Sequence, residues 1–317
     1  MARKMINRET VAGRVYEHNL AVKVTGDTSK NPGTEYIGGT LDVATDEDCL
    51  NIVTINFTYV TATTKLGSAN ATYSALKKII DSGKTVVLDG KDAATMVSVS
   101  TALALNDFYS SQSGEEKLIS AKRNEGGFVT IINKLPESDD KRNHFEMDML
   151  INGTRIVEAD EEKNIPADYL VVKGAVFNFR NAILPVEFVV KNPGGIKYFE
   201  SLGASEKNLV FTKVWGSINS ETIVTRREEE SAFGEPVVKE YERSIKEWVI
   251  TGAAAEPYEI GDAETGITFD EIKTAMADRE VYLADVKKRQ DEYQASKVAG
   301  NAASVAKSSA AAGGFDF

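Results

Sequence analysis

Aromatic and basic side chains alternate along three segments that we expect to be strands. Residues two apart on a strand project from the same face. Each segment therefore presents a row of side chains that could stack nucleic-acid bases on aromatic rings and hold the flanking phosphates with cations. The rows are Arg14, Tyr16 and His18; Phe211, Lys213 and Trp215; and Lys239, Tyr241 and Arg243.

Other residues of the same kinds lie next to these rows. Phe177, Phe179 and Arg180 close one expected strand, and Lys30 lies in a loop rich in glycine and proline. A single aromatic ring is more often packed in a core, and we expect Phe211 to be buried. The prediction of a nucleic-acid surface therefore depends on the repeated combination of cation and ring, not on any one ring.

The C-terminal stretch has a different composition from the rest of the chain. Residues 295–314 are mostly alanine, serine and glycine, which cannot bury enough apolar surface to offset the entropy of the chain. We expect a flexible tether. It ends in Phe315, Asp316 and Phe317, a compact aromatic and acidic peptide that a partner could bind in an apolar pocket bordered by arginine or lysine.

This tail resembles the C-terminal tip of bacterial and phage single-stranded DNA-binding proteins. In that family a low-complexity linker ends in acidic residues and a terminal phenylalanine, and the tip recruits replication and repair proteins. The resemblance covers the linker and the last five residues, and this chain has one aspartate where the family usually has several acids. It implies a partner site at Phe315, Asp316 and Phe317.

The order of expected elements repeats once along the chain. The first half predicts strands at 11–25, 35–44, 50–60, 95–105 and 117–132, with a helix at 71–81 after the third strand. The second half predicts strands at 145–158, 169–179, 184–191, 209–218 and 237–251, with a helix at 195–202 in the same place. Individual residues also match, because Tyr36 and Gly39 correspond to Tyr169 and Gly174.

Three strands, one short helix and two strands is the order of a five-stranded OB barrel. We therefore expect a mostly β fold with two tandem OB-like barrels, each with a capping helix. An SH3-like barrel or a strand-rich virion protein would fit the same pattern. The Phe177, Phe179 and Arg180 group becomes a candidate for this reason, because OB folds bind ligands across their second and third strands.

The region after Gly252 predicts a linker and then a helix. Thr268 and Glu271 form a capping box, and the helix should end near Gln294. Its sparse apolar residues favour docking against a barrel and leave self-association open. The expected domains are residues 1–135 and 136–252 for the barrels, 253–294 for the linker and helix, and 295–317 for the disordered tail.

Composition limits the classes of protein. The chain has 317 residues, a net charge of −11 and one cysteine, Cys49. The charge argues against coating duplex DNA through bulk positive charge, although a local basic groove remains compatible with it. No internal disulfide can form, and no apolar run could cross a bilayer or act as a secretory signal. We expect a cytoplasmic protein that makes no membrane contact.

Catalytic chemistry has little support in the sequence. His18 and His144 are the two histidines, which leaves almost no material for a zinc site or a nucleophilic triad. A phosphate-binding loop fails at Lys78, where its first glycine should lie, and a calcium loop fails at Pro32. We therefore expect no enzyme activity, no cofactor and no metal.

Together these patterns predict a protein, encoded by a phage or mobile element, that binds single-stranded DNA during replication or recombination and recruits partners through its C-terminal tip. The alternative is a structural or assembly protein of a virion, in which the barrels are packing modules. Retention on single-stranded DNA that is lost with salt would distinguish the first from the second.

Overall fold

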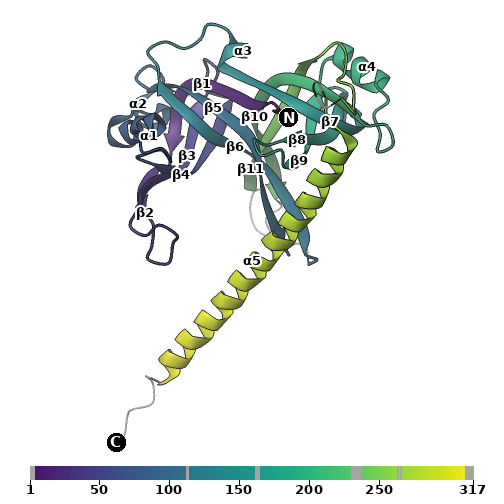
Figure 1. The fold of residues 1–317 in the computed structure, drawn as a ribbon. Helices are drawn as coiled ribbons and strands as arrows, with labels where there is room; N and C mark the ends of the chain where they lie inside the picture. Colours follow the sequence, from purple (N-terminus) through teal and green to yellow (C-terminus); the bar gives the residue numbers. More distant parts are fainter. Residues whose placement is uncertain are drawn as a thin grey trace, which may run out of the picture. The chain divides into compact units, whose positions relative to one another are not determined.

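The computed structural model describes residues 4–111, 114–160, 165–229, 237–262, 264 and 266–310, with backbone alone for 221–229, 237–244 and 297–310. The chain divides into two compact units, Met1–Ala104 with Arg123–Phe269, and Leu105–Lys122 with Asp270–Phe317. The fold is mostly β with a C-terminal helix, as the sequence predicts, and its described strands form one large sheet (Figure 1).

The sheet has eleven strands among the described residues. Their order is β10-β11-β9-β8-β7-β1-β5-β6-β4-β3-β2, with further pairings of β10 with β7 and of β1 with β3. The strands are β1 (Asn7–His18), β2 (Ala21–Val24), β3 (Glu35–Ala44), β4 (Ile52–Thr61), β5 (Met96–Ser110), β6 (Lys117–Ile131), β7 (Asn143–Val157), β8 (Tyr169–Phe177), β9 (Ile183–Val190), β10 (Val210–Glu229) and β11 (Val237–Ala253).

Five strands of the first half pair in a closed circuit. β1 is antiparallel to β3 and to β5, β3 is antiparallel to β4, β4 is parallel to β6, and β6 lies beside β5. The helices α1 (Ala71–Ser82) and α2 (Val86–Asp89) lie between β4 and β5 in the chain. Alternate strand residues such as Val43, Ile55 and Val99 are buried together with Leu76 and Ile79 of α1, because one face of each element is apolar.

The second half repeats this circuit. β7 is antiparallel to β8 and β10, β8 to β9, and β10 to β11, while β9 and β11 are parallel. The helix α4 (Pro193–Ser201) follows β9, and Asn192 caps its N-terminus. α3 (Asp139–Arg142) joins the halves, and β1 pairs with β7, so the two circuits share one sheet.

Two local details recur in both halves. The first residue of β1, Asn7, exchanges two hydrogen bonds with the backbone of Leu103, and the first residue of β7, Asn143, does the same with Ile218. Gly39 and Gly174, which correspond in the sequence, both lie against the backbone of a neighbouring segment: a Cβ would lie 2.6 Å from the Asn19 carbonyl oxygen in one case and 2.2 Å from the Leu150 carbonyl oxygen in the other.

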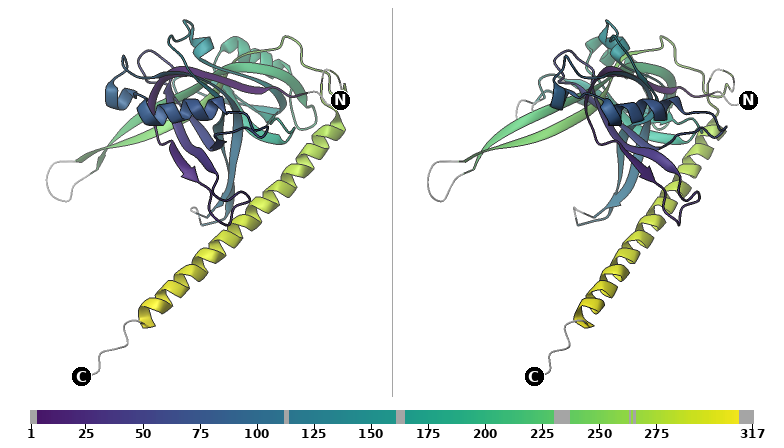
Figure 2. Two further views of the ribbon diagram at one scale, coloured as in Figure 1. Left: turned by 60° about the vertical axis from the view of Figure 1, so that its left-hand side comes forward. Right: turned by 90° about the vertical axis from the view of Figure 1, so that its left-hand side faces the viewer.

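Some strands differ from their predicted bounds. The strand expected over 11–25 is two strands, β1 and β2, and β10 continues eleven residues beyond the predicted end at Ile218, to Glu229. β10 and β11 thereby form a long hairpin that extends away from the other strands of its unit (Figure 2). The extension carries many charged residues and few large apolar ones, so apolar alternation gave no signal for it.

The second unit pairs the tip of the β5–β6 hairpin with α5 (Phe269–Ala310). Arg279 donates to both carboxylate oxygens of Asp107, at 2.8 and 3.3 Å, and the Asp107 side chain is 2% exposed. Gln290 exchanges hydrogen bonds with the backbone of Tyr109, and Lys287 contacts Glu116. α5 is therefore held to the hairpin by polar contacts at both ends of the contact region.

The predicted end of this helix near Gln294 is wrong. α5 continues to Ala310, so residues 295–310 are helical where the sequence predicted a disordered tether. Alanine has the highest helix propensity, and a helix already begun can extend through an alanine-rich segment at little cost. Among the described residues no helix is long and apolar enough to span a bilayer.

Candidate nucleic-acid interface

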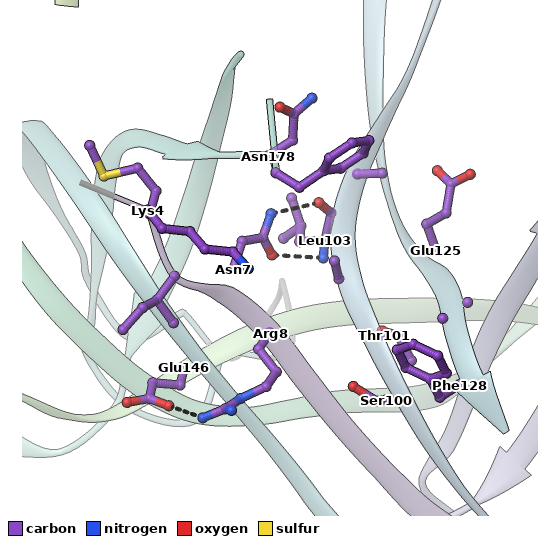
Figure 3. A pocket seen from close by; sticks show the side chains of 17 residues that line it. Lys4, Asn7, Arg8, Ser100, Thr101, Leu103, Glu125, Phe128, Glu146 and Asn178 are labelled. Carbon is purple, nitrogen blue, oxygen red and sulfur yellow. Dashed lines mark hydrogen bonds and ion pairs between the residues drawn. The ribbon is translucent and has the colours of Figure 1, made fainter. Parts of the chain in front are cut away.

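A groove of about 750 Å³ lies on the first unit, where β1 passes between β5 and β7 (Figure 3). Its walls come from the start of β1, the middle of β5, β6, one residue of β7 and the turn after β8. The lining residues are Lys4, Met5, Ile6, Asn7, Arg8, Ser100, Thr101, Ala102, Leu103, Ala104, Glu125, Gly126, Gly127, Phe128, Glu146, Asn178 and Phe179.

Small residues form much of the lining on β5 and β6, where Ser100, Ala102 and Ala104 alternate and Gly126 and Gly127 are consecutive. A Cβ on Gly126 would lie 2.2 Å from the Phe57 ring, and one on Gly127 would lie 2.7 Å from the Ser100 carbonyl oxygen. Glycine is therefore required for β6 to pack this closely. The small side chains keep the groove open.

Two phenylalanine rings border the groove and are largely exposed. Phe128, on β6, is 76% exposed, and Phe179, in the turn between β8 and β9, is 80% exposed. The Asn178 Oδ1 accepts hydrogen bonds from the backbone N–H groups of Arg180 and Ala182, which fixes the turn that presents Phe179. Exposed rings of this size are available to stack on a ligand.

Cations line the groove, and one lies beside the Phe179 ring. Lys4 is exposed, and the Arg8 side chain is 65% exposed. The Arg180 guanidinium lies 5.1 Å from the centre of the Phe179 ring, within the range of a cation–π contact. Exposed rings and cations therefore occur at the same groove.

Glu146 is held between two of these cations. Its carboxylate accepts from Arg8 at 2.6 Å and from Lys213 at 2.7 Å (Figure 3 shows the Arg8 contact). The hydrogen bond from Lys213, together with Arg8, lowers the pKa of Glu146, and the same bond raises the pKa of Lys213. Both groups are therefore charged around neutral pH.

A buried carboxyl lies directly behind the groove. Glu9, the neighbour of Arg8 on β1, is fully buried and accepts hydrogen bonds from the hydroxyl of Thr101 on β5 and from the Trp248 Nε1 on β11, the latter at 2.8 Å. Burial raises the pKa of Glu9 to about 7, against the opposing effect of these two donors. Glu9 joins the two halves of the sheet through neutral donors.

The structure brings three of the sequence-predicted residues to this surface. Phe179 lines the groove, Arg180 covers its ring, and Lys213 reaches the groove through Glu146. Trp215 lies two residues along β10 from Lys213, is half-buried, and packs on the backbone of β11, where a Cβ at Gly252 would lie 2.4 Å from the indole nitrogen.

The row predicted on the first strand does not share one face. A bulge between Val15 and Glu17 places Arg14 opposite Ala44 but His18 opposite Leu41, three residues apart on β3 and so on opposite faces. Arg14 pairs with Glu47 at 3.4 Å. His18 is half-buried, which lowers its pKa, and Tyr16 is half-buried at the bulge.

Phe177 is a second correction. It is 1% exposed, and its ring packs edge-on against the buried Phe211 with their centres 6.3 Å apart, so it has no face free for a base. Lys30 is exposed in the loop between β2 and β3 and does not line the groove. The prediction is therefore wrong for Phe177, the last core residue of β8, whereas Phe179, two residues further on in the turn, is exposed.

Other predicted residues lie beyond what the structure describes in full. Lys239, Tyr241 and Arg243 are on β11 and pair with Arg227, Thr225 and Ile223 of β10, but their side chains are not described. Phe315, Asp316 and Phe317 lie outside the described residues. Their roles stay predictions.

Sequence reasoning missed Lys4, Arg8 and Phe128. The available signal for Phe128 was its position directly after two glycines within a strand, where a large apolar residue interrupts the alternation of apolar and polar residues. Arg8 and Lys4 belong to a basic N-terminal segment that was assigned no role. No signal in the sequence showed that this segment lies beside Glu146 and Phe179.

A family model described as YorF matches residues 6–289, and the chain belongs to the YorF family. The chain resembles two crystal structures of the single-stranded DNA binding protein from Thermus aquaticus. The wild-type protein is 9% identical with a TM-score of 0.47, covering 83% of this chain and 98% of that one. A deletion mutant is 10% identical with a TM-score of 0.44, covering 79% and 94%. Among curated proteins, none matches the chain.

Proposed function

We propose that this protein binds single-stranded nucleic acid, with single-stranded DNA as its ligand, in the groove bordered by Phe128 and Phe179. The observation that carries the proposal is one groove that combines two rings more than three-quarters exposed with the cations Lys4 and Arg8, and that has Arg180 beside the Phe179 ring. Stacking on exposed rings and phosphate contacts by cations are the two interactions that sequence-independent single-strand binding requires.

The strand pairing supports the same proposal at the level of the fold. In the first circuit β1 pairs with β3 and β5, and β4 pairs with β6 in parallel. In the second circuit β7 pairs with β8 and β10, and β9 pairs with β11 in parallel. In each circuit a helix lies between the third and fourth strands in the chain. We interpret the circuits as two OB barrels, a fold that commonly binds oligonucleotides. The matching Asn7 and Asn143 contacts and the matching Gly39 and Gly174 positions favour an internal duplication.

The groove would bind without cleaving. Its acids, Glu125 and Glu146, each lie near a cation, Arg123 and Lys213 respectively, and Glu146 carries a lowered pKa that is unsuited to a general base near neutral pH. The proposed role is therefore to protect exposed strands, not to act as an enzyme. Lys239, Tyr241 and Arg243 on the long hairpin would extend the binding surface.

The salt dependence of binding tests the cations. Replacing Lys4 and Arg8 by alanine should weaken affinity for all sequences alike and reduce the slope of log affinity against log salt by roughly 0.7 for each phosphate that is no longer neutralised. The measurement is a fluorescence titration with oligo-dT at several salt concentrations. The matched control replaces Lys77, which is partly exposed, and Lys134, which is exposed; both lie outside the groove, and the slope should be unchanged. If the Lys4 and Arg8 variant had the same slope as the control variant, Lys4 and Arg8 would not be part of the interface.

We further propose that Phe315, Asp316 and Phe317 recruit a replication or recombination protein. Deleting residues 313–317 should leave the thermal unfolding midpoint and DNA affinity essentially unchanged and abolish capture of that partner, and Phe317→Ala should cause most of the loss by removing the ring that fills the partner's pocket. Pull-down with the full-length chain measures this effect. A clear drop in thermal stability on truncation would mean that the segment packs on the fold and would overturn the proposal.

A further inference from the structure

Glu146 lies where it satisfies two cations from two different strands. On β7 it is directly opposite Arg8 of β1 and diagonal to Lys213 of β10, whose own partner in the register is Asp148. One carboxylate oxygen accepts from Arg8 at 2.6 Å and the other from Lys213 at 2.7 Å. Each oxygen of the carboxylate therefore serves a different cation at the wall of the groove.

A phosphodiester, like this carboxylate, presents two oxygens that can accept from two cations. It carries one negative charge shared by two oxygens that can each accept from a cation, and arginine and lysine are the side chains that bind it. An anion that enters the groove next to Phe128 and Phe179 meets Arg8 and Lys213 already engaged by Glu146. The phosphate and Glu146 cannot use the same hydrogens of Arg8 and Lys213 at one time.

The exposure of the three side chains makes an exchange possible. Arg8 is 65% exposed, Lys213 30% and Glu146 21%. Ion pairs that are accessible to solvent contribute little to stability because water screens them, so the folded chain would not depend on these contacts. The cations are nonetheless held in place at the groove before any ligand arrives.

We propose that Glu146 is an internal competitor for nucleic-acid phosphate, whose carboxylate occupies the position between Arg8 and Lys213 that a phosphodiester takes in the complex. This inference rests on the proposed single-strand binding. It assigns Glu146 the role of limiting affinity, so that the protein releases strand readily, and it predicts that removing the carboxylate tightens binding. If these ion pairs only stabilised the fold, removing the carboxylate would not tighten binding.

The experiment compares Glu146→Gln with a matched control, Glu247→Gln. Glu247 pairs with Lys191 at the same 2.7 Å and is 24% exposed, but it does not line the groove. In oligo-dT titrations Glu146→Gln should bind roughly two- to fivefold tighter at low salt, the range expected for breaking one exposed ion pair. Its log affinity should fall more steeply with log salt, by roughly 0.7 for each additional phosphate that the freed cations neutralise. Glu247→Gln should match the wild type.

A second pair of variants separates competition from net charge and from positioning. Glu146→Asp keeps the charge but shortens the reach, so it should also bind more tightly than the wild type. Adding Arg8→Ala to Glu146→Gln should remove most of the increase in affinity. Weaker binding by Glu146→Gln would show that the carboxylate positions Arg8, and equality with Glu247→Gln would show no competition; either result overturns the inference while the proposed function stands. Absence of binding by the wild type would overturn both.

Discussion

Replacing Phe128 and Phe179 by alanine should each weaken single-strand binding by about 1–3 kcal/mol, which corresponds to roughly five- to 150-fold in affinity. The rings are 76% and 80% exposed, so they contribute little to the core, and their removal should leave the thermal unfolding midpoint nearly unchanged. Binding is measured by fluorescence anisotropy with labelled oligo-dT at fixed salt.

The matched control is Phe269→Ala. Phe269 is 64% exposed at the start of α5 and does not line the groove, so its removal should not alter affinity. The Phe128 and Phe179 losses should also be nearly additive, because the rings stack on different bases. Wild-type affinity in both groove variants, with unchanged stability, would exclude this groove as the binding surface.

Replacing Glu9 by glutamine should raise the free energy of unfolding at pH 8 by up to about 3 kcal/mol, the equivalent of a pKa shift from 4.5 to about 7. Burial favours the protonated carboxyl in the folded state, so the folded protein holds a proton that the unfolded chain releases. The contribution of Glu9 to the stability of the wild type should therefore be greatest below pH 4.5, fall as the pH rises to 7, and level off above pH 7. Glutamine mimics the neutral form and should flatten the profile.

Urea unfolding at pH 5, 6, 7 and 8 measures this difference. Glu137→Gln serves as the control, because Glu137 is exposed and pairs with Lys134 on the surface. The stabilisation by Glu9→Gln should be small at pH 5 and reach its full size at pH 8. Parallel profiles for the wild type and Glu9→Gln would show that Glu9 is not protonated in the folded protein near neutral pH.

Much of the element order could be predicted because local patterns decide it. β3 has the predicted bounds Glu35–Ala44, and α1 begins at Ala71 as expected, because Asn70 caps it and Leu76 and Ile79 form its buried side. The repeat of three strands, a helix and two strands was visible for the same reason. Hydrophobic alternation indicates which residues face a core, and each of these segments has a face that packs on a core.

The groove could not be predicted, because pairing between distant strands assembles it. Arg8, Phe128, Glu146 and Phe179 come from different elements, and their meeting depends on the register of β1 with β7 and β5. The bulge at Val15 and Glu17 also reversed the faces along β1, which a count of alternate residues cannot detect. Phe177 and Phe179 differ only in lying before and after the end of β8.

Titrating the full-length wild-type protein with oligo-dT at several salt concentrations tests whether the chain binds single strands through charge and stacking. We expect binding at low salt, a linear fall of log affinity with log salt, and weaker binding to duplex DNA of the same length. No detectable binding to oligo-dT at low salt, or an affinity that salt does not change, would contradict it.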